Sequence, residues 1–144
     1  MSEFKVYDLN EVTCNFGGLP VESGFGDGEV IQIEQLEPDF VTKVGADGSV
    51  TRSKTNKRLT KVTIVLQQTS PGNAILSVLN NIDRLASNGA GVVPILIRDR
   101  QGLSLFAGAQ AWIEGPPKAA YGGESTDREW IIMVAFPERF DGGN

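Results

Sequence analysis

The 144-residue sequence contains no histidine, a single cysteine and no long apolar run. Without histidine, the commonest general base and neutral metal ligand, Ser-His-Asp and Cys-His catalytic arrangements are excluded. One cysteine without histidine also excludes ordinary zinc ligation and any internal disulfide. No stretch approaches the roughly 18 apolar residues that a membrane span requires. These absences disfavour an enzyme, and we expect no catalytic residues, no cofactor, no metal and no membrane partner.

Carboxylate chemistry remains as an alternative, because paired acids such as Glu34 and Glu37 can in principle carry out acid–base catalysis. Acidic residues on a predicted exposed strand nevertheless serve solvation in most proteins. The glycines of Gly24–Gly28 lack the spacing of a dinucleotide-binding fingerprint, and no helix follows them, so they predict a turn. The polar N-terminus carries Glu3, Lys5 and Asp8 without an apolar segment, so we expect no secretory signal. We therefore expect the chain to stay in the cytoplasm unless it leaves within an assembled particle.

The net charge is −5 at pH 7, with a pI near 4.7. An acidic chain repels nucleic-acid phosphates on average, which disfavours a protein that reads DNA or RNA. The same sign of charge suits a surface past which DNA must move without binding.

The charged residues change sign abruptly in the first half of the chain. The acidic block consists of Glu22, Asp27, Glu29, Glu34, Glu37 and Asp39. The basic block consists of Lys43, Arg52, Lys54, Lys57, Arg58 and Lys61, with Asp47 as the one exception. Adjacent blocks of opposite sign suit a surface that meets a copy of itself, since complementary potentials steer association and fix register. Head-to-tail contacts of this kind form rings or filaments, and the alternative is that the blocks are ordinary solvated strand faces.

Alternation of apolar and polar residues predicts a mainly β domain that spans residues 1–144. We expect about six or seven strands and one helix, which suits a β-sandwich or small barrel. The principal expected strands are Glu11–Phe16, Glu29–Leu36, Leu59–Gln68, Val92–Ile97, Leu103–Ile113 and Arg128–Phe136, with a polar tail at Phe140–Asn144.

The one helix is expected at about Pro71–Ser87. Ser70 is the predicted N-cap, Pro71 suits the first helical position, and Asn88-Gly89 suits the end. Ile75, Leu79 and Ile82 recur at helical spacing and predict the face that packs on the sheet.

A long β-hairpin is expected at about Asp39–Arg58. Asp47-Gly48 lies between two β-prone runs, which is a strong hairpin signal. The arms are polar and contain few core residues, so we expect the hairpin to project from the body. The polar segment Ser53–Asn56 suits a segment that becomes ordered on a partner.

Cys14 alternates with Val12 and Phe16, so we expect it to be a buried small apolar residue rather than a nucleophile. Ile31 and Ile33 are expected to face the core. The aromatic residues are expected mostly in the core, with the two tryptophans in the core or at a subunit contact: Phe16, Phe25, Phe106, Phe136, Trp112 and Trp130.

The run Asp8–Gly18, followed by Gly24–Ile31, resembles the N-terminal pattern of tail tube proteins of contractile-tailed (myovirus-type) bacteriophages. The order that follows is similar as well: a charged hairpin, the Leu59–Gln68 strand, the helix start at Ser70-Pro71, and the closing strands. The resemblance extends over roughly residues 8–136.

This resemblance implies hexameric rings in which strands of all subunits join into one inner β-barrel. The rings would stack into a tube inside a contractile sheath, with the tape measure protein and then DNA in the channel. Sheath, baseplate and tail terminator proteins would be partners, and the location would be the virion, after assembly in the host cytoplasm. Related subunits build the inner tubes of type VI secretion systems and tailocins.

We therefore expect a subunit interface rather than an active site. Its candidate residues are Lys43, Asp47, Arg52, Lys54, Lys57, Arg58, Glu37 and Asp39. The candidates for the lumen are Glu29, Glu34 and Glu37, which could equally be inter-subunit partners. An acidic lumen would let DNA slide without specific binding, because duplex DNA is densely anionic. The alternatives are an inner-tube subunit of a secretion or tailocin system, a tail terminator, or a monomeric ligand-binding β-barrel.

Overall fold

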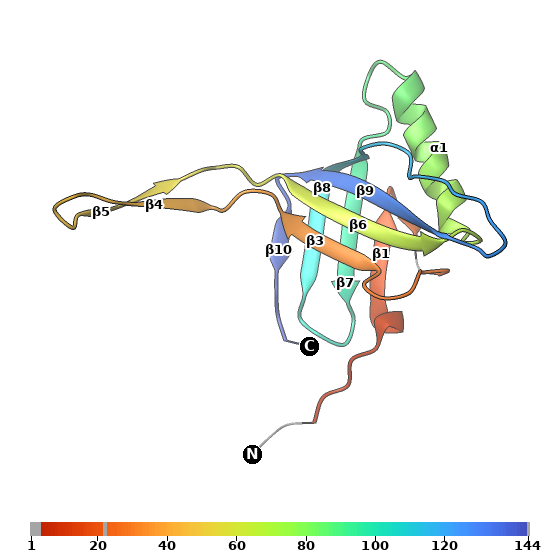
Figure 1. Cartoon of the computed structure of the whole chain (residues 1–144), viewed down its shortest axis with the longest axis horizontal. Helices are drawn as coiled ribbons and strands as arrows, with labels where there is room; N and C mark the ends of the chain where they lie inside the picture. The colour runs from red at the N-terminus through yellow and green to blue at the C-terminus, as the bar shows by residue number, and fades with distance from the viewer. Residues whose placement is uncertain (1–3, 22, 144) are drawn as a thin grey trace.

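The computed structural model describes residues 4–21 and 23–143, so Glu3, Glu22 and Asn144 lie outside the described residues (Figure 1). The described chain is mainly β, with one α-helix, as the sequence predicts. The helical elements are the 3₁₀ turn η1 (Leu9–Glu11) and α1 (Gly72–Leu85). The strands are β1 (Val12–Phe16), β2 (Leu19–Pro20), β3 (Ile31–Gln35), β4 (Phe40–Val44), β5 (Val50–Lys54), β6 (Thr60–Gln67), β7 (Val93–Asp99), β8 (Leu105–Ile113), β9 (Asp127–Ala135) and β10 (Glu138–Phe140).

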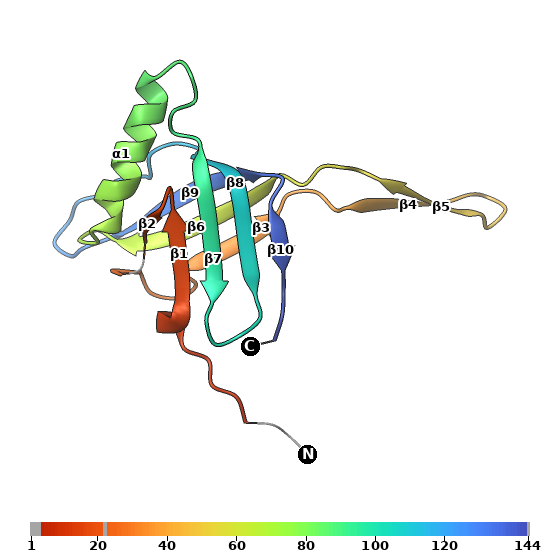
Figure 2. The ribbon, with the colours of Figure 1, turned by 180° about the vertical axis from the view of Figure 1, so that it is seen from behind.

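Eight of these strands form one antiparallel sheet in the order β2-β1-β7-β8-β9-β6-β3, with β10 paired to β8 outside this path. The sheet folds over itself, so that β1, β7 and β8 cross behind β3, β6 and β9 in Figure 1 and in front of them in Figure 2. Strand β9 joins the two layers, because it pairs with β6 along most of its length and with β8 at its end. The order ends at β2 and β3, so one described chain does not close a barrel.

The core lies between the two layers. Alternate residues of β6 and β9 point into it, as the period of a β-strand requires, and residues of β1, β7 and β8 close it from the other side. Its members include Phe16, Val62, Ile64, Leu66, Ile95, Phe106, Trp130, Ile132 and Val134. Ile31, Ile33 and Phe25 are partly buried against this cluster, and Trp112 is half-buried. Phe136 is 66% exposed, so its predicted place in the core is wrong.

Cys14 is buried between the layers and lies opposite Ile97 of β7. Burial raises the pKa of the Cys14 thiol to about 12, because the apolar surroundings disfavour the thiolate. The thiol is therefore neutral at physiological pH. The prediction that Cys14 is a packing residue rather than a nucleophile agrees with this environment.

Helix α1 begins one residue later and ends two residues earlier than expected. Pro71 occupies the N-cap position, while the Ser70 hydroxyl accepts a hydrogen bond from the Gly72 amide at 3.2 Å. The predicted buried face is shifted as well, since Leu76 is fully buried whereas Ile82 is exposed. Leu76 and its neighbour Leu79 pack on the core, which leaves an apolar stripe on the outside of the helix. This stripe consists of Val78, Ile82 and Leu85.

One segment near the C-terminus differs from expectation. Glu138–Phe140 pairs with Leu105–Ala107 and forms β10, whereas the sequence predicts only a polar tail at Phe140–Asn144. Pro94 lies inside β7, which is an internal strand, and the register shifts between Val93 and Ile95. A bulge at this point accommodates the missing proline N–H.

The β4–β5 hairpin forms its own two-stranded sheet and extends away from the body (Figure 1). Every residue of both strands is exposed. The Asp47 carboxylate accepts a hydrogen bond from the Ser49 amide at 3.0 Å, and Gly48 adopts a φ of +90°, which favours glycine. At the base of the hairpin, the Thr55 hydroxyl donates to the carbonyl of Pro38 at 2.7 Å. A two-stranded hairpin is marginally stable in isolation.

None of the helical segments in the described part of the chain has the length and apolar character that a bilayer crossing needs.

The packing of helix α1 on the sheet should depend on Leu76. We expect Leu76→Ala to lower the free energy of unfolding by about 2–5 kcal/mol, because it deletes a fully buried side chain and leaves a cavity. Val78→Ala on the exposed face of the same helix should change it by no more than about 0.5 kcal/mol. Urea unfolding of the two variants measures both values, and equal losses would contradict the assigned helix face.

Candidate assembly interface

The structure brings one pair of the predicted interface residues into direct contact. Lys57 Nζ lies 3.4 Å from a carboxylate oxygen of Glu37 at the base of the hairpin, and both side chains are more than half exposed. Asp39 accepts a hydrogen bond from the Gln35 side chain at 2.9 Å. Exposed ion pairs contribute little to stability because water and salt screen them. These charges are therefore available for exchange with a partner.

The basic residues of the hairpin divide between its two faces. Arg52 lies over the ring of Phe40, with its guanidinium carbon 4.2 Å from the ring centre. Lys54 pairs in register with Phe40, and Val44 pairs with Val50. Because cross-strand partners share a face, this face combines apolar and cationic side chains that are all exposed. We call it the hairpin face: Phe40, Thr42, Val44, Val50, Arg52 and Lys54.

Lys43 lies on the opposite face of the hairpin, and Asp47 lies in the turn. Hydrogen bonds from the Ser49 side chain and backbone hold the pKa of Asp47 below its usual value. Asp47 therefore shapes the turn in addition to adding charge.

The base of the hairpin contains an apolar cavity that sequence reasoning missed. Its volume is about 340 Å³, and Leu36, Leu59 and Phe136 line it. The Arg58 guanidinium carbon lies 6.0 Å from the Phe136 ring centre. Phe136 has a φ of +51°, a conformation that is sterically costly for a bulky residue. Since Phe136 precedes a proline, which favours extended backbone, the sequence carries no signal for this geometry.

The three predicted lumen residues do not share one site. Glu34 lies on the exposed face of β3, opposite Lys61 of β6. Glu29 precedes β3 and accepts a hydrogen bond from Gln32 at 3.1 Å, while Glu37 follows β3 at the hairpin base. They are distributed along the edge strand of the sheet. Their position relative to a lumen stays a prediction.

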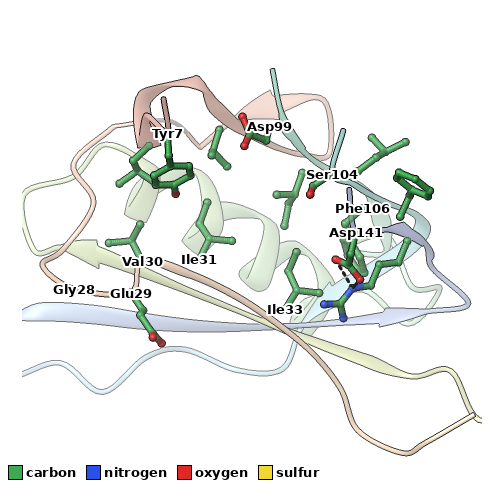
Figure 3. Close-up of a pocket in the computed structure, with 16 residues that line it drawn as sticks. Tyr7, Gly28, Glu29, Val30, Ile31, Ile33, Asp99, Ser104, Phe106 and Asp141 are labelled. Carbon is green, nitrogen blue, oxygen red and sulfur yellow. Dashed lines mark hydrogen bonds and ion pairs between the residues drawn. The ribbon is translucent and has the colours of Figure 1, made fainter. Parts of the chain in front are cut away.

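An open groove of about 480 Å³ lies between β3 and the layer of β7, β8 and β10. Ile31 and Ile33 lie on one side of it, and Tyr7 and Asp99 lie on the other (Figure 3). Within the described chain, β3 has a strand partner on one side only, and so has β10. An unpaired edge beside an apolar groove is a surface on which another chain can add. We call this region the edge groove.

Among residues 4–21 and 23–143, no three His, Cys, Asp or Glu side chains are grouped so that they could share a metal ion. The features that stand out are instead unpaired strand edges and exposed apolar side chains. These are features of subunits that assemble.

Residues 1–137 match the family model described as Bacteriophage PhiTE tail tube protein. The chain belongs to this family. It is 31% identical over 122 residues to structural protein ORF10 of Pseudomonas phage KPP10. The aligned region covers 85% of this chain and 70% of that protein. The predicted membership of a phage tail tube family is confirmed, and the chain is a structural protein of the virion.

Solved structures share the fold at low sequence identity. The sheath/tube terminator of the extracellular contractile injection system PVC superimposes with a TM-score of 0.62 at 15% identity, over 98% of this chain and 100% of that chain. The tube-terminating cap of the anti-feeding prophage gives a TM-score of 0.61 at 11% identity, over 97% and 94%. A chain of the PVC sheath–tube complex gives 0.60 at 14% identity, over 92% and 90%. These likenesses establish the fold.

Because Phe136 has a left-handed backbone conformation, replacing it should not lower the free energy of unfolding, in contrast to most substitutions of large apolar residues. We expect Phe136→Asn to leave the free energy of unfolding unchanged or to raise it by about 1 kcal/mol, because asparagine tolerates this φ. The same variant should assemble less well, since it removes an exposed apolar side chain. Phe140→Asn is the control, because it removes a similar ring without a strained φ. Urea unfolding and sedimentation measure the two effects, and equal destabilisation of both variants would contradict the strain.

Proposed function

We propose that this protein is the repeating subunit of a tail tube. Hexameric rings would stack into a hollow conduit inside a contractile sheath, and the tape measure protein and then DNA would occupy the channel. The β4–β5 hairpin is the main support for this proposal. Both of its strands are fully exposed, its two-stranded sheet is only marginally stable in isolation, and the chain that contains it belongs to a tail tube family. Such an element is explained if it is stabilised by another subunit.

The open sheet supports ring formation. Strands β3 and β10 each lack a partner on one side within the described chain. Exposed strand edges are an aggregation hazard that closure across subunits removes. Lateral joining of these edges would extend the sheet from one subunit to the next, and a closed ring would leave neither β3 nor β10 with a free edge.

Charge supports contact between the hairpin and a neighbouring subunit. The hairpin face presents Arg52 and Lys54, while β3 and its flanks present Glu29 and Glu34. If the basic hairpin of one subunit lay on the acidic flank of its neighbour, the charges of the basic block and of the acidic block would be paired. Glu37 and Asp39 lie next to this flank, so the Glu37–Lys57 pair could be exchanged for an inter-subunit pair.

The excess of acidic residues supports a conduit for DNA. The chain has 18 acidic and 13 basic residues. A ring of subunits multiplies this excess, and an anionic channel repels the phosphate backbone. Glu29, Glu34 and Glu37 are the proposed lumen residues. The outer partners would be the sheath, baseplate and tail terminator proteins.

A tail terminator is the second candidate function. Two of the solved structures with this fold are a tube-terminating cap and a sheath/tube terminator. A terminator closes the end of a tube and would form rings that do not stack. An inner-tube subunit of a phage-like secretion system would polymerise as a tail tube does.

The purified protein should form hollow tubes at high concentration. Negative-stain electron microscopy across a concentration series measures this. Stacked tubes are expected for the tube subunit, isolated rings would instead favour the terminator, and monomers at every concentration would contradict a self-sufficient tube subunit.

The basic residues of the hairpin base should be needed for stacking. We expect Lys54→Glu, Lys57→Glu and Arg58→Glu together to abolish tubes while the monomer stays folded, because these residues are exposed. A variant with Arg98, Arg100 and Lys118 changed to glutamate has the same net charge and leaves the hairpin intact. Microscopy and circular dichroism compare the two. Tubes in the first variant, or their loss in both, would contradict the role of the hairpin.

A further inference from the structure

A second groove, with different lining residues from the edge groove, lies beside α1. Its volume is about 550 Å³. One wall is α1, the other is the loop 114–126, and the start of β9 forms part of its lining. We call it the helix groove. Its main lining residues are Asn80, Arg84, Pro117, Tyr121, Arg128 and Trp130.

Arg128 is a buried cation that pairs with no carboxylate of the described residues. It is 7% exposed, and no carboxylate of the described residues lies within 4.0 Å of its guanidinium. Its Nη1 donates to the Thr126 hydroxyl at 2.8 Å, and the Tyr121 ring centre lies 5.4 Å away. Its sequence neighbours in β9, both acidic, point to the other face because side chains alternate along a strand. Burying an uncompensated charge costs free energy.

Asn80 contributes a largely buried side chain whose amide is open to the groove. It is 8% exposed, lines the groove, and its side chain forms no hydrogen bond with the described residues. By contrast, Asn73 accepts a hydrogen bond from Trp130 Nε1 at 2.9 Å and donates to the Gln67 carbonyl at 2.8 Å. Asn73 therefore fixes the floor of the groove. No fully buried side-chain polar atom among the described residues lacks a partner, so the unbonded Asn80 amide is accessible from the groove and free to bond to a ligand there.

No acidic side chain lines the helix groove, although the whole chain carries a net charge of −5. Arg84 from the last turn of α1 adds a second guanidinium. The groove thus differs in sign from the chain around it. This local reversal points to an anionic ligand.

We propose that the helix groove binds an extended acidic segment of a partner protein. A carboxylate of that segment pairs with Arg128 and Arg84, because guanidinium groups bind carboxylates through paired hydrogen bonds. The backbone of the segment bonds to Asn80, since an amide side chain both donates to and accepts from a peptide group. The proposal goes beyond tube formation and stands whether or not this chain polymerises.

The dimensions and lining favour a peptide over a small anion. A volume of about 550 Å³ is far larger than a water-sized or carboxylate-sized site. Pro116, Pro117 and Tyr121 supply apolar surface along one wall, which a peptide can cover and an inorganic ion cannot.

The test measures binding of a fluorescent six-residue peptide of alternating glutamate and glycine to the full chain, by anisotropy. Light scattering checks that the protein is monomeric. The glutamine version of the peptide and inorganic phosphate are the ligand controls. We expect saturable binding of the acidic peptide, and affinity at least about tenfold weaker for the glutamine version, since charged hydrogen bonds carry the contact.

Arg128→Gln should weaken binding of the acidic peptide about tenfold or more. The melting temperature of this variant should not fall, because the substitution removes a buried charge that has no carboxylate partner among the described residues. Arg84→Gln, at an exposed position that cannot affect folding strongly, should weaken it about threefold. Arg98→Gln on β7 lies outside the groove and should bind as the unchanged protein does.

Three results would overturn the proposal. These are the absence of saturable binding, equal binding of the peptide and phosphate, and binding that Arg128→Gln leaves unchanged. If the peptide blocks self-assembly and assembled protein no longer binds it, the occupant is a second copy of this chain, and the assignment to another protein is wrong. If the protein binds the peptide but forms no tubes, that result would contradict the proposed function and leave the helix-groove proposal in place.

Discussion

The fold depends on the double pairing of β9. This strand pairs with β6 for most of its length and with β8 at its end. Because those two strands belong to layers that cross, β9 fixes the angle between the layers and thereby the width of the core. Trp130, Ile132 and Val134 fill that core from β9 itself. The end of β9 also sets the position of Phe136 and hence the base of the hairpin. The start of β9 sets Arg128 in the helix groove.

Much of the fold follows from local pattern. Alternation along Leu59–Gln68 predicts β6 to within a residue at each end, and the Asp47-Gly48 turn predicts the hairpin strands. Burial of Cys14 follows from its apolar neighbours. These features are decided by residues close together in the sequence, so the sequence alone can indicate them.

The features that escaped prediction depend on distant contacts. β10 has three residues and exists because β8 offers a partner about 30 residues earlier in the chain. The buried face of α1 is set by the sheet beneath it, which selects Leu76 over Ile82. The blocks of charged residues are visible in the sequence, but the Glu37–Lys57 pair and the burial of Arg128 appear only when separate segments come together. Sequence reasoning therefore named exposed charged residues whose role at an interface stays a prediction, and it missed the cavity at the hairpin base and the helix groove.

The hairpin has a mechanical consequence. It joins the body through two short connections, residues 36–39 and 55–59, and shares no strand ladder with the main sheet. Few hydrogen bonds cross this junction, among them the contact of the Leu36 amide with the Leu59 carbonyl at 3.2 Å. A load applied to the hairpin therefore reaches the body only through this narrow joint. In the proposed tube, this joint would let neighbouring subunits rotate slightly against each other while the packed interior of each subunit kept its shape.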